Sequence, residues 1–162
     1  MKKTKIKTNA LRLLDKAGIS YETREYDVDE DDLSGLTVAK KIGLPSEQVF
    51  KTLVVKGDKT GVFLASIPTD MELDLKKLAE SSGNKKVDLV PLKDVQALTG
   101  YIRGGVSPVG TKKQYILYLD SRASGFPFIS LSAGVRGCQM LVDPGELSKI
   151  LDVKLGDISK YS

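Results

Sequence analysis

Residues 49–55, Val49-Phe50-Lys51-Thr52-Leu53-Val54-Val55, have the composition of a buried β-strand, because β-branched and aromatic side chains dominate them. Side chains alternate between the two faces of a strand, so Lys51 is expected on the same face as Val49, Leu53 and Val55. An ammonium group on such a face must be paired, reach a cleft or take part in chemistry, because burying an uncompensated charge costs several kcal/mol or more. Lys51 is therefore either a functional residue or an edge-strand lysine that extends to water and blocks aggregation.

The segments around this strand mix helical and extended patterns without repeated βαβ units, which predicts an α+β fold around a mostly antiparallel sheet. Residues 57–61 are expected to form a five-residue hairpin loop between two strands. Helices are expected where a capping residue precedes an amphipathic stretch and a glycine ends it. The expected helices cover residues 8–17, 34–42, 74–81 and 92–98, with a further helix beginning at Pro144. The expected strands cover residues 20–26, 49–55, 62–67, 115–119, 126–131 and 138–142, with a short strand near Val87.

Length and composition predict a single domain over residues 1–162, with 41% hydrophobic and 28% charged residues, as in soluble globular proteins. No run of apolar residues is long enough for a membrane span, and no apolar segment follows Met1-Lys2-Lys3 as in a secretory signal. A single cysteine agrees with a reducing compartment. The expected location is therefore the cytoplasm, with no membrane partner.

The chain contains no histidine and one cysteine, Cys138. This excludes Ser-His-Asp and Cys-His nucleophilic systems, imidazole zinc sites and internal disulfides. Neither a metal nor another cofactor is expected. Any chemistry must use lysine, carboxylates, hydroxyl groups, backbone amides or groups of the substrate itself. Cys138 itself is expected to be a small core residue.

The positive charges are grouped, and the net charge is +4. Such groups can hold an RNA phosphate backbone, or they can simply be part of a solvated surface. An acidic turn that contains Asp27, Asp29, Glu30, Asp31 and Asp32 lies between them. The basic groups are Lys2, Lys3, Lys5 and Lys7 at the N-terminus, and the pairs Lys85-Lys86 and Lys112-Lys113.

Two loops of small residues are candidates for close ligand approach. The first, Gly104-Gly105-Val106-Ser107-Pro108, combines two glycines, a hydroxyl group and a rigid proline. Glycine lets a ligand approach the backbone and exposes amides as donors, although a plain turn has the same composition. The second loop, residues 130–137, is expected to follow a strand in the same way.

These motifs together resemble those of the YbaK/EbsC family, bacterial Cys-tRNA(Pro) deacylases related to the editing domain inserted in prolyl-tRNA synthetases. The resemblance runs in order through almost the whole chain. It implies a mixed, mostly antiparallel sheet or partial barrel flanked by helices, with the pocket beside the Lys51 strand. The matching stretches are residues 49–53, Leu73-Asp74-Leu75-Lys76-Lys77, Thr99-Gly100-Tyr101 with the 104–108 loop, and Ser132-Ala133-Gly134 with Arg136-Gly137.

The resemblance also implies a reaction and residue roles. Lys51 is expected to hold the phosphate of the terminal adenosine or to stabilise the ester oxygen. Gly105 and Ser107 complete the expected catalytic set, with the amides of Gly104 and Gly105 near the carbonyl. The expected substrate-binding residues are Tyr26, Gly104, Pro108, Ser132 and Gly134, and the expected RNA-binding residues are Lys85, Lys86, Lys112 and Lys113. The implied partner is the acceptor end of an aminoacyl-tRNA, with prolyl-tRNA synthetase as a second candidate and no DNA.

The implied chemistry is attack of the substrate's own thiol on its ester carbonyl, which releases a cyclic thiolactone without an enzyme nucleophile. The chain departs from some family members at Ala133 and at Gln139, where others carry an aspartate. Both positions could alter substrate choice. Two alternatives therefore stay open: hydrolytic editing of Ala-tRNA(Pro), and a noncatalytic RNA- or nucleotide-binding regulatory module.

Overall fold

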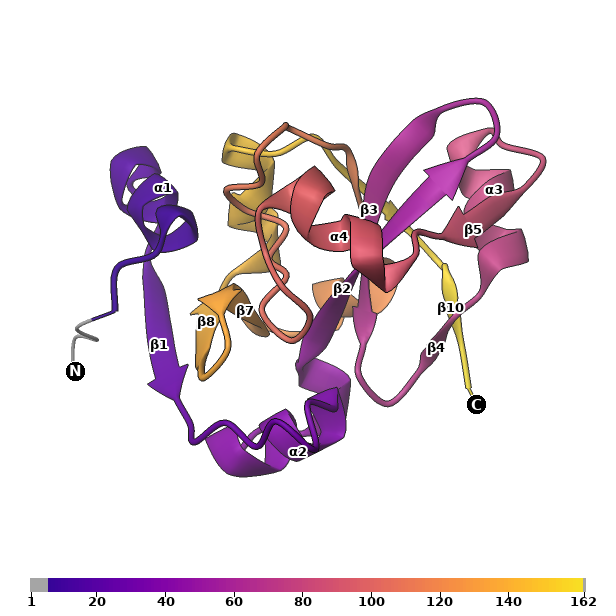
Figure 1. The fold of residues 1–162 in the computed structure, drawn as a ribbon. Helices are drawn as coiled ribbons and strands as arrows, with labels where there is room; N and C mark the ends of the chain where they lie inside the picture. The colour runs from indigo at the N-terminus through magenta and orange to yellow at the C-terminus, as the bar shows by residue number, and fades with distance from the viewer. Residues whose placement is uncertain (1–5, 162) are drawn as a thin grey trace.

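The computed structural model describes residues 6–161, and a five-stranded mixed sheet forms its centre (Figure 1). Strands β2 and β3 pair antiparallel through eight residues, from Phe50 opposite Pro68 to Gly57 opposite Gly61. β5 pairs antiparallel with the other edge of β2, whereas β6 and β9 extend the sheet in parallel from β3. The strands of this sheet are β2 (Phe50–Gly57), β3 (Gly61–Pro68), β5 (Val87–Leu89), β6 (Leu117–Asp120) and β9 (Val153–Gly156).

A second, antiparallel sheet has the order β1-β8-β7. An isolated parallel bridge between Val49 and Ser130 joins this sheet to the start of β2. The α+β fold with a mixed, mostly antiparallel sheet is thereby confirmed. The remaining strands are β1 (Tyr21–Glu25), β7 (Ile129–Val135) and β8 (Cys138–Val142), with β4 (Glu72–Leu73) and β10 (Ser159–Lys160) forming a separate antiparallel pair.

The helices begin and end where the local sequence predicts. The side chains of Thr8, Ser34 and Asp74 each accept a hydrogen bond from a backbone amide of the first helical turn, which satisfies a donor that has no partner inside the helix. A glycine with a left-handed backbone ends each helix, because a side chain would be strained there. The α-helices are α1 (Asn9–Ala17), α2 (Gly35–Ile42), α3 (Leu75–Ser82) and α4 (Leu92–Thr99).

Hydrophobic side chains pack on both faces of the β2–β3 pair. Val54 and Leu64 belong to the main core. Val55 and Ile67 belong to a second cluster, which packs under α3. A third, smaller cluster packs α2 against Val49. The strand that carries Lys51 is therefore packed on both faces.

Several details differ from the sequence prediction. The segment after Pro144 is a 3₁₀ helix, Pro144–Lys149, and not an α-helix. The strand predicted at 126–131 begins at Ile129 and continues to Val135, because it pairs with β8 through a bulge, so much of the predicted 130–137 loop is strand. The hairpin loop has three residues, since the register continues to Gly57 and Gly61. Strands β4, β9 and β10 were not predicted.

Short 3₁₀ turns, Ser46–Gln48 and Ser121–Gly125, complete the elements. Within residues 6–161, no helix has the length and apolar character needed to cross a lipid bilayer.

Candidate active site

Lys51 lies on the predicted face of β2, directly opposite Ile67 of β3. It is half-buried and makes no ion pair with a described residue. Burial lowers the pKa of its ammonium group from the usual 10.5, and the carboxylates of Glu72 and Asp70 partly oppose this effect. Lys51 is thus a cation with little internal compensation, which favours a partner that carries negative charge.

A polar wall lies on the neighbouring sheet. Ser132 of β7 is opposite Gln139 of β8, and the hydroxyl of Ser130 hydrogen-bonds to the Gln139 Oε1 at 2.8 Å. All three side chains are buried. The parallel bridge pairs Val49 with Ser130. The start of β2, which carries Lys51, therefore lies beside the part of β7 that carries Ser130 and Ser132. Of these three residues, only Ser132 was predicted from the sequence to be a substrate-binding residue, and it was expected in a loop where the structure has strand β7.

The 104–108 loop packs against the turn between β7 and β8. Gly104 has a φ of 84°, in the left-handed region. A Cβ atom on Gly105 would lie 3.2 Å from backbone atoms of Val135 and Arg136, so this position has little room for a side chain. Arg136 fixes the contact from the other side, since its Nε donates a hydrogen bond to the Arg103 carbonyl at 2.8 Å. The loop and the end of β7 are therefore held together.

The Gly105 amide is not a free donor in this structure. It donates to the Ile102 carbonyl at 2.9 Å and closes a turn. The amides of Gly104 and Val106 donate to no described residue. The same holds for the amide of Ser107, so any amide donation from this loop in the present conformation comes from Gly104, Val106 or Ser107.

Ser107 and Pro108, the last two residues of the loop, are buried. The Ser107 Oγ accepts a hydrogen bond from the Val109 amide at 3.2 Å, as hydroxyl groups do in local turns. Gly134 has a φ of 99°, and a Cβ atom there would lie 2.9 Å from the Tyr101 ring. These contacts give Ser107 and Gly134 clear structural roles in shaping the loop and the strand end.

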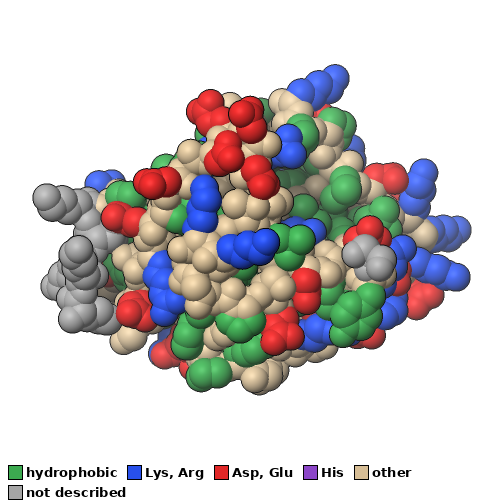
Figure 2. All heavy atoms as spheres, turned by 90° about the horizontal axis from the view of Figure 1, so that it is seen from below, with side chains coloured by type: hydrophobic (Ala, Val, Ile, Leu, Met, Phe, Trp, Pro, Cys, Tyr) green, Lys and Arg blue, Asp and Glu red, His purple; other side chains and the backbone are tan. Residues whose placement is uncertain are grey.

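Tyr26 lies at the end of β1, where its amide donates to the Gly137 carbonyl at 2.9 Å. It packs against the α2 cluster and lines a pocket of about 670 Å³ with Lys41 and Arg136. Figure 2 views the molecule from the α2 side and shows acidic and basic side chains interspersed, with acidic side chains gathered at one edge. Tyr26 thus lines a surface pocket whose lining does not include Lys51.

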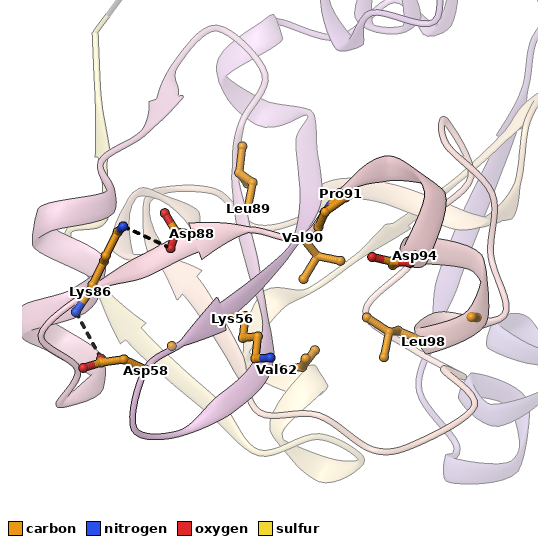
Figure 3. A pocket seen from close by; sticks show the side chains of 12 residues that line it. Lys56, Asp58, Val62, Lys86, Asp88, Leu89, Val90, Pro91, Asp94 and Leu98 are labelled. Carbon is orange, nitrogen blue, oxygen red and sulfur yellow. Dashed lines mark hydrogen bonds and ion pairs between the residues drawn. The ribbon is translucent and has the colours of Figure 1, made fainter.

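The predicted RNA-binding lysines are exposed. Lys86 lines a pocket of about 720 Å³ between β2, β5 and α4 (Figure 3). Lys56 and Val62, which also line it, are on the face of the β2–β3 pair opposite to Lys51. Lys112 and Lys113 lie in the segment before β6. Lys7 pairs with Asp15 at 2.9 Å, while Lys2, Lys3 and Lys5 lie outside the described residues.

Cys138 is fully buried, and burial raises the pKa of its thiol to about 11. A thiol of this kind is protonated at neutral pH and is a poor nucleophile. Within residues 6–161, no group of three or more potential ligand residues could hold a metal ion. The chemically active groups near Lys51 are therefore hydroxyl, amide and carboxylate groups.

The structure is a small α+β domain in which the lysine-bearing strand is bridged to the strand of the serine–glutamine wall, and a glycine loop packs against the turn between β7 and β8. The chain belongs to the aminoacyl-tRNA editing domain family, whose sequence pattern matches residues 35–159. An Enterococcus faecalis protein, proposed to be the Cys-tRNA(Pro)/Cys-tRNA(Cys) deacylase EbsC, is 46% identical over 158 residues, which cover 98% of this chain and 96% of that relative.

Two further matches have lower sequence identity. Proline–tRNA ligase 1 of Streptomyces avermitilis is 34% identical over 77 residues, which cover 48% of this chain and 14% of the ligase. The crystal structure of a proposed trans-editing enzyme for prolyl tRNA synthetase has a TM-score of 0.81 and 25% sequence identity, and the match covers 96% of this chain and 99% of that one.

Proposed function

We propose that this protein is a free-standing deacylase that releases cysteine from Cys-tRNA(Pro). Membership of the editing domain family and the similarity to the Enterococcus faecalis relative support the proposal. The observation that carries it is Lys51, a half-buried cation without an ion-pair partner among the described residues, on the strand next to the polar wall. Such a cation matches the terminal phosphate or the oxygen of an aminoacyl ester as negative charge develops.

The proposed step is an internal displacement. The thiol sulfur of the esterified cysteine forms a bond to its own carbonyl carbon, and the bond from that carbon to the ribose oxygen breaks. The thiol proton ends on the departing ribose hydroxyl, so no water, oxidant or reductant is consumed. The protein has to hold the ester in the reactive geometry and stabilise the oxyanion.

Different residues have different roles in this step. Lys51 supplies positive charge, and Ser132 supplies a hydroxyl on β7, the strand that is bridged to the start of β2. The amides of Gly104, Val106 and Ser107 are the donors that the 104–108 loop leaves free of described partners. Gly105 has a positioning role, because a Cβ atom there would lie only 3.2 Å from backbone atoms of Val135 and Arg136. Tyr26 and Pro108 shape the surroundings.

The wall residues favour attack by the substrate over attack by water. Ser130, Ser132 and Gln139 are neutral and hydrogen-bonded, and none is a general base for water at neutral pH. A substrate thiol is already partly ionised near neutral pH, so it needs less help.

The test is a panel of Cys-, Ala- and Pro-charged tRNA(Pro), with loss of each ester followed over time. Rapid loss of the cysteinyl ester alone, with the thiolactone as the first product, is the expected result. Equal loss of the alanyl ester would assign the protein to hydrolytic editing instead. Loss of none of the three, with the tRNA still bound, would make the protein a binding module.

A further inference from the structure

A pocket of about 350 Å³ lies beyond the end of β3 and contains none of the residues assigned to the proposed reaction. Its walls come from four separate parts of the chain. Glu47 precedes β2, Asp70 and Met71 follow β3, Phe126 follows β6, and Tyr161 lies near the C-terminus. We refer to it as the Asp70 pocket.

Asp70 has an unusual environment. Its Oδ1 is shielded from solvent and has no hydrogen-bond partner, and it is the one buried side-chain nitrogen or oxygen in this state among residues 6–161. A carboxylate oxygen that has lost its water without gaining a donor costs free energy. Lys51 is near enough for Asp70 to favour its charged form, but the two groups make no ion pair.

Arg122, which also lines the pocket, does not supply the missing donor. Its Nη1 bonds to both carboxylate oxygens of Asp120, to Asp157 Oδ1 and to Ser159 Oγ, at 3.1 to 3.3 Å. The positive charge in the wall is therefore committed to other carboxylates. Asp70 and Glu47 remain as acidic groups that make no ion pair with a described residue.

The other walls are apolar or aromatic. Met71 is buried, Phe126 is half-buried, and Tyr161 is exposed. Aromatic faces attract cations, and an apolar wall accommodates a hydrocarbon stem. Acidic groups beside apolar and aromatic walls match a ligand that carries a positively charged nitrogen on an aliphatic chain.

We propose that the Asp70 pocket binds a primary ammonium or guanidinium group carried on an aliphatic stem, with Asp70 as the main anionic contact. The ligand can be a free amine or the lysine or arginine side chain of a partner protein, since both present the same head and stem. This inference does not rest on the proposed deacylation, because it concerns different residues and its test uses no tRNA.

The test is a titration of the whole protein with n-butylammonium, followed by backbone amide NMR shifts of Asp70, Gly125 and Tyr161. n-Butanol is the neutral control ligand, and acetyl-lysine amide and acetyl-arginine amide represent a partner side chain. We expect saturable shifts with the cations and none with the alcohol. Tighter binding of an amino-acid amide than of butylammonium assigns the pocket to a partner, and the reverse order assigns it to a free amine.

Asp70→Asn should weaken cation binding at least tenfold, whereas the matched change Glu80→Gln, at an exposed position on α3, should leave it unchanged. If Asp70→Asn misfolds, Glu47→Gln provides the same comparison with a smaller expected loss. No saturable shift, equal binding of butanol, or unchanged affinity in the Asp70→Asn or Glu47→Gln protein would overturn the proposal.

Discussion

Lys51 lies directly opposite Ile67 in the antiparallel β2–β3 pair, and Ile67 is fully buried. An ammonium group beside a buried isoleucine loses hydration and gains no hydrogen bond from that neighbour. Such a position is unfavourable for folding and is retained in proteins mainly where function requires it. The stability of the domain should therefore improve when this charge is removed.

We expect Lys51→Met to raise the free energy of unfolding at neutral pH, because methionine keeps most of the stem and removes the charge. The folded-state pKa of Lys51 is below its usual 10.5, so the unfolded chain holds more protons between those two values. Stability should therefore rise with pH through that window in the wild-type protein, and the advantage of Lys51→Met should shrink. Urea unfolding between neutral pH and about pH 10.5 measures both. A Lys51→Met protein that is less stable at neutral pH would assign the lysine a structural role.

Cys138 should resist thiol reagents in the folded protein. Its side chain is fully buried, and burial raises the pKa of the thiol to about 11, so almost no thiolate exists at neutral pH. We expect labelling by iodoacetamide to become fast only when the protein unfolds in denaturant. Rapid labelling of the native protein, checked by mass spectrometry, would contradict both the burial and the absence of a reactive cysteine.

Changing each glycine of the 104–108 loop to alanine should affect the protein in a different way. Gly104→Ala places a side chain at a φ of 84°, which costs about 1–2 kcal/mol in stability. Gly105→Ala places a Cβ atom 3.2 Å from the Val135 and Arg136 backbone, so it should displace the loop and lower turnover more than it lowers stability.

Gly125→Ala is the matched control, since a Cβ atom there meets nothing within 4 Å. Ser107→Ala should lose about 1 kcal/mol of stability, the usual value for one internal hydrogen bond, with a mild effect on turnover. Turnover of the Gly105→Ala protein equal to that of Gly125→Ala would reduce the loop to a plain turn.

RNA capture should depend on exposed lysines and on salt. Changing Lys85 and Lys86, or Lys112 and Lys113, to glutamine should raise KM for aminoacyl-tRNA more than it lowers kcat. The slope of log affinity against log salt should flatten by about 0.7 for each single-stranded phosphate that the variant no longer neutralises. Lys154→Gln, at an exposed position on β9, is the control. An unchanged slope in both pair variants would move the RNA contacts elsewhere, with the Lys41 and Arg136 pocket as the next candidate.

Local signals explain what could be predicted from the sequence. Thr8, Ser34 and Asp74 cap helices through contacts within one turn, and alternation along a strand places Lys51 on its face without knowledge of the partner strand. The Ser132–Gln139 pair could not be predicted in the same way, because Ser132-Ala133-Gly134 has the composition of a loop and becomes strand only by pairing with β8. Strands β9 and β10 were missed because their partners, β6 and β4, are distant in sequence. The lone Oδ1 of Asp70 depends on packing alone.

The most direct test of the central claim is the turnover of Cys-tRNA(Pro) by the wild-type protein and by Lys51→Ala, with circular dichroism spectra to confirm that both are folded. If Lys51 stabilises the developing charge on the ester, Lys51→Ala should lower the rate by about 10²–10³ while the fold is unchanged. A folded Lys51→Ala protein that releases cysteine at nearly the wild-type rate would contradict the account.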